Sequence, residues 1–213
     1  MRGDRTFQLP GQMREGCVAL IAVNLRVRCK SRLSVSLEAV DRLKLVRKML
    51  LQVLDAARYS STVGQIVVVS PERDELPPEV PVLADSGSGL NEALSQAQAI
   101  FHSSGLREML VLPADLPLVQ PADIDKVVRA GRRTGFAIAP DAANSGTNAL
   151  YLRAQSPFRF QFGIDSKARH LAEAERLGWT ARVVHVPGMA FDVDLPADLL
   201  QLEPWQWSQR RPA

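Results

Sequence analysis

One stretch of the chain reads Val111-Leu112-Pro113-Ala114-Asp115-Leu116-Pro117-Leu118, an apolar run that ends in a single acid between two prolines. This pattern is typical of a buried strand that carries a carboxylate to the edge of a sheet, where parallel sheets bind their ligands. A helix cap or a loop salt bridge explains one acid at a strand end equally well. Other parts of the chain must therefore decide between these interpretations.

A second acidic stretch, at residues 191–196, has the same proline punctuation and contains Asp192 and Asp194. Residues two apart in an extended segment point the same way, so both carboxylates can join Asp115 in one cleft. Three converging carboxylates are costly unless a cation lies between them. A small set of oxygen ligands suits Mg²⁺ that carries a phosphate substrate, so the pattern favours metal-dependent phosphate chemistry.

The composition predicts one ordinary globular domain. The 213 residues are 46% hydrophobic and 23% charged, which suffices for one α/β core and is short for two. The net charge of +3 requires neither nucleic acid nor a membrane as partner. Cys17 and Cys29 lack metal-ligand spacing, and no apolar run reaches the roughly 18 residues of a membrane span. We therefore expect a cytoplasmic protein without a disulfide scaffold or a zinc site.

Apolar runs alternate with helical periods along the chain. Strands are expected at residues 18–23, 65–69, 82–84, 108–112, 136–139, 148–152 and 181–186. Helices are expected after an N-cap at Ser36 as far as residue 57, and at 91–101, 121–132 and 166–177. This alternation predicts an α/β fold, a three-layer α/β/α sandwich with a mostly parallel sheet.

The domain is expected to span residues 17–203. Residues 1–16 are polar and mixed in charge, which predicts a disordered tail. Residues 204–213 form a second tail, whose Trp205 and Trp207 we expect to dock on the domain or on a partner subunit of a homodimer.

Several loops offer groups that suit an anionic ligand. Residues 26–32, after the first strand, carry four cations in seven residues, which would serve a triphosphate or form a solvated basic surface. They lack the P-loop spacing, and residues 86–89 lack the third glycine of a dinucleotide fingerprint, which argues against a dehydrogenase. Residues 145–148 and 162–166 supply hydroxyls and backbone N–H groups, although each alone is more often a turn or a cap. His170, one helical turn after Ser166, is a further candidate for the same ligand.

Together these pieces resemble the 2-phospho-L-lactate guanylyltransferase family, which makes the guanylylated precursor of the deazaflavin coenzyme F-420. The resemblance covers about residues 17–200 and rests on the order and spacing of six motifs. The motifs are Lys30-Ser31-Arg32-Leu33, Gly89-Leu90-Asn91-Glu92-Ala93-Leu94, residues 112–118, residues 146–150, Phe162-Gly163 with Ser166 and His170, and Asp192-Val193-Asp194. The resemblance implies a Rossmann-like nucleotidyltransferase domain.

The same resemblance implies the reaction and the residues that carry it. GMP would pass from GTP to the phosphate of 2-phospho-L-lactate, phosphoenolpyruvate or 3-phospho-D-glycerate, with release of pyrophosphate. The implied residues are Lys30, Arg32 and Asp115 for catalysis, Ser31, Gly89 and Asn91 for the nucleotide, Thr147, Gly163 and Ser166 for the acceptor, and Asp115, Asp192 and Asp194 for Mg²⁺.

Two positions depart from the family pattern. Asn24 stands where a lysine is usual, and Asp165 stands where the acceptor loop has a glycine. An acid beside a doubly anionic substrate is unfavourable unless it turns outward or pairs with a cation, or unless it accepts the hydroxyl of 3-phospho-D-glycerate. The alternatives are a nucleotidyltransferase of the same fold with another nucleotide or acceptor, and a non-catalytic nucleotide-binding descendant.

Overall fold

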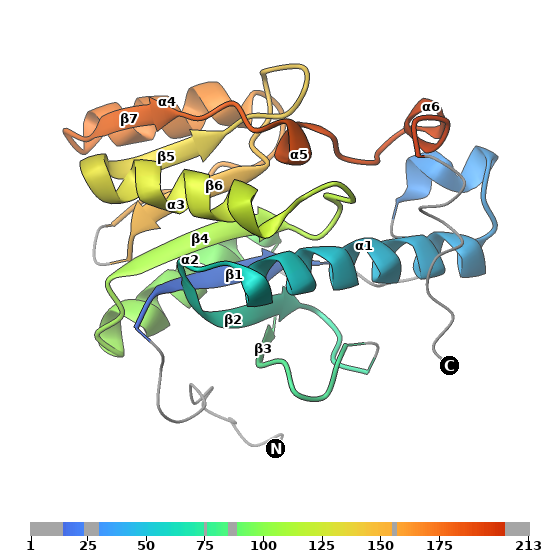
Figure 1. The fold of residues 1–213 in the computed structure, drawn as a ribbon, viewed down its shortest axis with the longest axis horizontal. Helices are drawn as coiled ribbons and strands as arrows, with labels where there is room; N and C mark the ends of the chain where they lie inside the picture. Colours follow the sequence, from blue (N-terminus) through green and yellow to red (C-terminus); the bar gives the residue numbers. More distant parts are fainter. Residues whose placement is uncertain (1–14, 24–29, 75, 85–88, 155–156, 203–213) are drawn as a thin grey trace.

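The computed structural model describes residues 15–23, 30–74, 76–84, 89–154 and 157–202, which form one seven-stranded sheet in the order β3-β2-β1-β4-β6-β5-β7 (Figure 1). The strands are β1 Cys17–Ala22, β2 Val63–Ser70, β3 Val82–Ala84, β4 Glu108–Pro113, β5 Gly135–Ala139, β6 Ala149–Arg153 and β7 Thr180–Val183. Strand β6 runs antiparallel to both of its neighbours, and the other pairs are parallel. The predicted mostly parallel sheet is confirmed.

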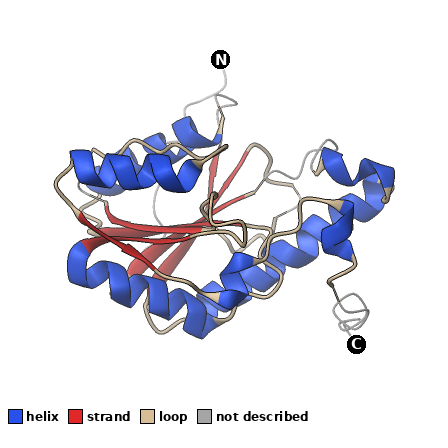
Figure 2. Cartoon of the chain, turned by 90° about the horizontal axis from the view of Figure 1, so that it is seen from above, coloured by secondary structure: helices blue, strands red, loops and turns tan. Residues whose placement is uncertain are grey.

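Helices cover both faces of this sheet (Figure 2). They are α1 Ala39–Tyr59, α2 Leu90–Ser103, α3 Pro121–Thr134, α4 Ser166–Arg176, the short α5 Pro187–Ala190 and α6 Pro196–Leu199, and the 3-10 helix η1 Ser31–Val35. Alternate residues of β1 enter different cores: Ala19 and Ile21 pack in the core that includes α1 and α3, and Val18 and Leu20 in the core that includes α2 and α4. This confirms the three-layer sandwich. None of the helices in the described part of the chain is long and apolar enough to cross a membrane.

The first long helix begins later than predicted. Ser36 is not its N-cap: α1 starts at Ala39 after Glu38, and the Ser36 N–H donates to the Leu33 carbonyl at the end of η1. Leu33 is fully buried in the core, which holds the chain in a tight turn before α1 begins. The elements α6 and η1 lie beside one another beyond the end of the sheet (Figure 1).

The carboxyl ends of four parallel strands meet at one edge of the sheet. Ala22 at the end of β1 pairs with Val69 of β2 and with Pro113 of β4. The strand order reverses between β1 and β4, which makes this edge the topological switch point where open α/β sheets bind ligands. Because β6 is antiparallel, its first residues lie at this edge as well, and the Asn148 N–H donates to the Ala139 carbonyl.

Candidate functional site

Three acids meet at the switch point. Asp115 follows the end of β4, and Asp192 and Asp194 lie between α5 and α6. One oxygen of each carboxylate lies within 4.8 Å of the others. Val193 between the latter two is fully buried, so the acids on either side of it share the opposite, open side of the segment. The predicted convergence of the three carboxylates is confirmed.

Lys30 brings a positive charge to this acid cluster, which we define as Asp115, Asp192 and Asp194. The Lys30 ammonium contacts Asp115 Oδ2 and Asp194 Oδ1. Burial opposes its charge, but the two carboxylates outweigh burial and raise the pKa of Lys30. Arg32 lies farther out, with a guanidinium nitrogen 4.0 Å from Asp194 Oδ2 and a side chain that is 73% exposed. Arg26, Arg28 and Asn24 lie outside the described residues.

Asp192 is a half-buried acid close to the other two carboxylates of the cluster. Burial and the nearby charge of Asp115 raise the pKa of Asp192 to about 6. The Asn148 amide partly opposes this rise by donating to Asp192 Oδ1 at 3.3 Å. Mg²⁺ binds oxygens at about 2.0–2.1 Å, so ligand atoms on opposite sides of the ion are about 4 Å apart. The three carboxylates therefore offer the oxygen ligands that Mg²⁺ prefers, and these oxygens lie within 4.8 Å of one another.

A second polar cluster is linked to these acids through Asn148. Thr147 directly precedes Asn148, whose amide donates to Asp192. The Thr147 Oγ1 accepts a hydrogen bond from the Ser166 hydroxyl at 3.1 Å. Both side chains are buried, with 6% of Thr147 and 2% of Ser166 exposed. The Lys167 N–H donates to the Ser145 carbonyl and ties the start of α4 to the turn before β6. The predicted acceptor hydroxyls are thus brought together beside the acid cluster.

Asn91 and the glycines lie on the surrounding loops. The Asn91 side chain accepts the Phe162 N–H at 2.7 Å and donates to the Phe162 carbonyl at 3.1 Å. It thereby holds residues 157–165, which we call the acceptor loop, against the start of α2. Gly89 and Gly163 have φ values of +96° and +123°, and a Cβ at either would meet nothing within 4 Å. A guanosine contact by Asn91 stays a prediction.

His170, the further candidate, contacts protein groups through both nitrogens of its ring. Its Nδ1 lies 3.1 Å from Thr147 Oγ1, and its Nε2 accepts the Gln161 N–H at 3.0 Å. Protein groups therefore engage both ring nitrogens, and the ring is fully buried. Its position one turn after Ser166 indicated the right cluster but not the role.

Sequence reasoning missed two residues that support the acids. Asn148 donates to Asp192, a role that the motif at residues 146–150 did not reveal although it contains this residue. Asp198 accepts the N–H groups of Asp194 and Leu195 at 2.8 and 2.6 Å and thereby fixes the backbone of the metal-facing segment. Its position just inside a helix that starts with a proline was the available signal.

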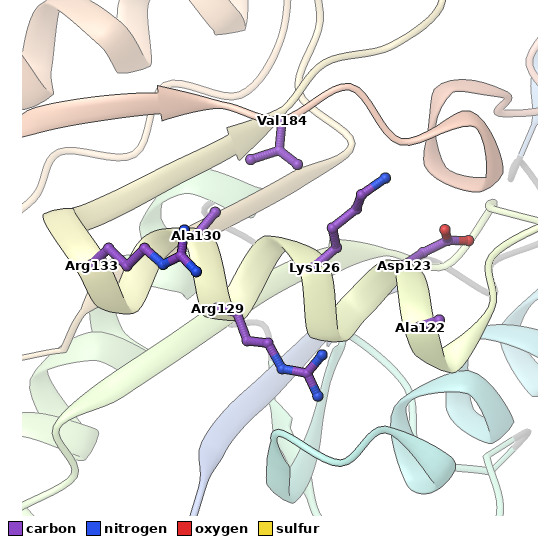
Figure 3. A pocket seen from close by; sticks show the side chains of 7 residues that line it. All are labelled: Ala122, Asp123, Lys126, Arg129, Ala130, Arg133 and Val184. Carbon is purple, nitrogen blue, oxygen red and sulfur yellow. The ribbon is translucent and has the colours of Figure 1, made fainter.

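A surface cavity of about 440 Å³ lies elsewhere, on α3 beside Val184 (Figure 3). Its charged lining consists of Asp123, Lys126, Arg129 and Arg133. None of the acid cluster or the acceptor hydroxyls lines it. The chemistry of the side chains, and not the size of a hollow, therefore locates the candidate site.

The structure resembles solved nucleotidyltransferases of low sequence identity. A nucleotidyl transferase from Methanothermobacter has a TM-score of 0.65 at 16% identity and covers 92% of this chain and 100% of that chain. A CMP:2-keto-3-deoxy-manno-octonic acid synthetase complexed with CTP has a TM-score of 0.62 at 13% identity, with coverages of 92% and 100%. These likenesses show a Rossmann-like nucleotidyltransferase fold.

Closer similarity is found among sequences. A phosphoenolpyruvate guanylyltransferase from Rubrobacter xylanophilus is 39% identical over 199 residues, which cover 91% of this chain and 97% of that protein. A 3-phospho-D-glycerate guanylyltransferase from Phenylobacterium zucineum is 31% identical over 192 residues, with coverages of 86% and 88%. Residues 17–203 match the family described as "Guanylyl transferase CofC like". The fold, the acid cluster and this match over most of the sequence agree, and the chain belongs to that family of guanylyltransferases.

Proposed function

We propose that this protein transfers GMP from GTP to the phosphate of a small phosphorylated carboxylic acid and releases pyrophosphate. The observation that carries the proposal is the acid cluster at the switch point, with Lys30 in contact with it and the Thr147–Ser166 hydroxyl pair beside it. Relatives named for phosphoenolpyruvate and for 3-phospho-D-glycerate support the choice of acceptor class.

The triphosphate would lie over the end of β1. Lys30 and Arg32 already lie beside the acid cluster and would neutralise phosphate oxygens, with Ser31 between them as a further polar contact. Gly89 and Asn91 would face the guanosine, as the family resemblance implies. Because Gly89 has open space where a side chain would be, the backbone there can approach the nucleotide closely.

Asp115, Asp192 and Asp194 would hold Mg²⁺. When bound there, the ion would supply charge neutralisation at the α-phosphate and at the leaving pyrophosphate. Asn148 and Asp198 would keep two of these acids in place through the hydrogen bonds described above. The convergence of three carboxylates is the feature of this chain that supports a divalent ion.

The reaction requires no general base. A phosphate monoester is mostly a dianion near pH 7, because its second pKa is about 6. One of its oxygens would attack the α-phosphorus of GTP and form a new P–O bond, while the bond from that phosphorus to the bridging oxygen breaks and pyrophosphate leaves. The protein would supply alignment and positive charge, the main contributions of enzymes to phosphoryl transfer.

Thr147, Gly163 and Ser166 would bind the acceptor, which we propose to be 2-phospho-L-lactate, phosphoenolpyruvate or 3-phospho-D-glycerate. Asp165 beside them is exposed at the start of α4, with a φ of +54°, so it can turn away from an anion or accept a substrate hydroxyl. If it accepts the hydroxyl of 3-phospho-D-glycerate, D165G shifts preference away from that acid; unchanged relative rates would contradict this role. By family resemblance, the product would feed synthesis of the deazaflavin coenzyme.

The decisive experiment measures pyrophosphate release with GTP, Mg²⁺ and each of the three acids in turn, and identifies products by mass spectrometry. D115N is expected to lose about a thousandfold or more in turnover, because it removes a central charge of the cluster. D41N is the matched control, since Asp41 is an exposed acid on α1 that pairs with Lys44. GTP binding without turnover of any of the acids would contradict the proposal, and turnover with another nucleotide would favour the alternative of a different specificity.

A further inference from the structure

Three buried polar side chains form a continuous chain of hydrogen bonds on the acceptor side. The Ser166 hydroxyl donates to Thr147 Oγ1 at 3.1 Å, and Thr147 Oγ1 lies 3.1 Å from His170 Nδ1. The side chain of His170 is fully buried and lies against the rings of Phe158 and Phe162. The direction of each hydrogen bond in this chain can be assigned.

The assignment starts at the far nitrogen of the histidine. A backbone N–H can only donate, and that of Gln161 is 3.0 Å from His170 Nε2, so Nε2 carries no hydrogen. A neutral imidazole then carries its one hydrogen on Nδ1. Burial among apolar rings lowers the pKa of His170 to about 4, which keeps the ring neutral. The Nδ1–H group therefore donates to Thr147 Oγ1.

Thr147 Oγ1 accordingly accepts two hydrogen bonds, one from His170 and one from Ser166. A hydroxyl oxygen has two lone pairs and one hydrogen, so both lone pairs are occupied and only the hydrogen remains for a further partner. Within the described residues, Thr147 Oγ1 makes no third hydrogen bond. A buried hydroxyl that can only donate favours an acceptor of negative charge.

We propose that His170 is a positioning residue that fixes the Thr147 hydroxyl as a dedicated hydrogen-bond donor to an anionic oxygen of the phosphorylated acid. This inference rests on the proposed function. His170 also holds the acceptor loop, because it takes the Gln161 N–H while Glu173 takes the Arg159 N–H at 3.0 Å. His170 thus holds one backbone group of the loop and also sets the polarity of the hydroxyl that would face the acceptor.

The first test is the tautomer of His170 in the ligand-free protein at pH 7, measured by ¹⁵N NMR of the imidazole. The expected result is a protonated Nδ1 and an unprotonated Nε2. His102 and His185, the other two histidines, are exposed and provide internal references. A protonated Nε2 would overturn the proposal. Because no substrate is present, this result is independent of the proposed function.

The second test compares H170N with H170Q. An asparagine amide N–H lies near the place of Nδ1–H and can still donate to Thr147, whereas a glutamine oxygen lies near the place of Nε2 and keeps only the contact to Gln161. H170Q is expected to raise the KM for phosphoenolpyruvate or 3-phospho-D-glycerate about tenfold and H170N only about twofold, with the KM for GTP unchanged in both. Equal effects of the two variants, or a parallel rise in the KM for GTP, would overturn the proposal.

If these variants do not fold, the unmodified protein still provides a test. Phosphoenolpyruvate added without GTP should shift the Nδ1 resonance of His170, because a hydroxyl that donates to an anion becomes a better acceptor. No shift at a saturating concentration would overturn the proposal. Absence of turnover with any of the three acids, together with a protonated Nδ1, would refute the proposed function and leave the hydrogen-bond assignment in place.

Discussion

Mild acid is expected to destabilise the folded protein through His170. Its pKa is about 4 in the folded protein against 6.5 for an unperturbed histidine. As the pH falls below 6.5, the unfolded chain binds a proton that the folded chain does not, so unfolding becomes more favourable. The stabilisation that comes from the neutral His170 ring is fully present above the pKa of the unfolded chain. It is lost as the pH falls towards the pKa of the folded protein. The shift corresponds to about 3 kcal/mol in total, of which about 2 kcal/mol is lost by pH 5.

The measurement is urea unfolding of the unmodified protein and of H170N at pH 7, 6 and 5. Asparagine does not titrate, so the difference between the two proteins isolates His170 from groups that also respond to acid. Asp192 is one of these in this pH range, because burial and the charge of Asp115 raise the pKa of Asp192 to about 6. The unmodified protein should lose about 2 kcal/mol relative to H170N between pH 7 and pH 5.

Parallel stability curves for the two proteins would refute this reasoning. They would mean that His170 binds a proton as readily in the folded state as in the unfolded state. The neutral ring, and with it the assignment of a donor hydroxyl on Thr147, would then be untenable.

Three other changes have defined outcomes. D192N should raise the melting temperature in EDTA, because burial and the charge of Asp115 disfavour the ionised form of Asp192. The variant should also lose the increase in melting temperature that Mg²⁺ gives the unmodified protein. A retained response to Mg²⁺ would exclude Asp192 as a ligand. N91A should raise the KM for GTP and for the acceptor, because Asn91 would face the guanosine and its amide pairs with the acceptor loop. Steady-state kinetics with an unchanged KM for GTP would exclude the guanosine contact. G131A should lower the free energy of unfolding in urea by about 1–3 kcal/mol, because the added Cβ would lie 2.0 Å from Tyr151 Cδ1. An unchanged urea midpoint would show that the Tyr151 ring moves away freely.

The sequence predicted the elements of the fold better than their directions. An apolar run such as Val111-Leu112 identifies a buried strand whatever its neighbours are, and all seven predicted strands are present. The reversal of β6 could not be predicted, because a short apolar run is the same in a parallel and an antiparallel pair. The start of α1 was missed because Leu37 fits the helical period, whereas the burial of Leu33 decides where the turn ends.

For the candidate site, too, local sequence patterns were predictable and contacts between distant residues were not. The carboxylates could be grouped because strand ends and alternation are local patterns that the sheet brings together. The contact of Lys30 with Asp115 and Asp194 joins residues 85 and 164 positions apart, and residue types alone do not encode such a pairing. The hydrogen bonds of Asn91 and His170 to backbone groups of the acceptor loop could not be predicted for the same reason: any residue of that loop offers the same N–H and carbonyl groups.

The reversed strand β6 begins at the edge of the sheet where the parallel strands end. Parallel strands β1 to β4 end at this edge, where Asp115 follows β4, and the turn that enters β6 carries Thr147. A strand that enters the site needs no crossover helix between the site and itself, so its leading turn can vary in length or composition while β1 and β4 keep their register. Under the proposed function, a change confined to the first residues of this turn and to the acceptor loop would alter the choice of acceptor, while Asn148 keeps its hydrogen bond to Asp192.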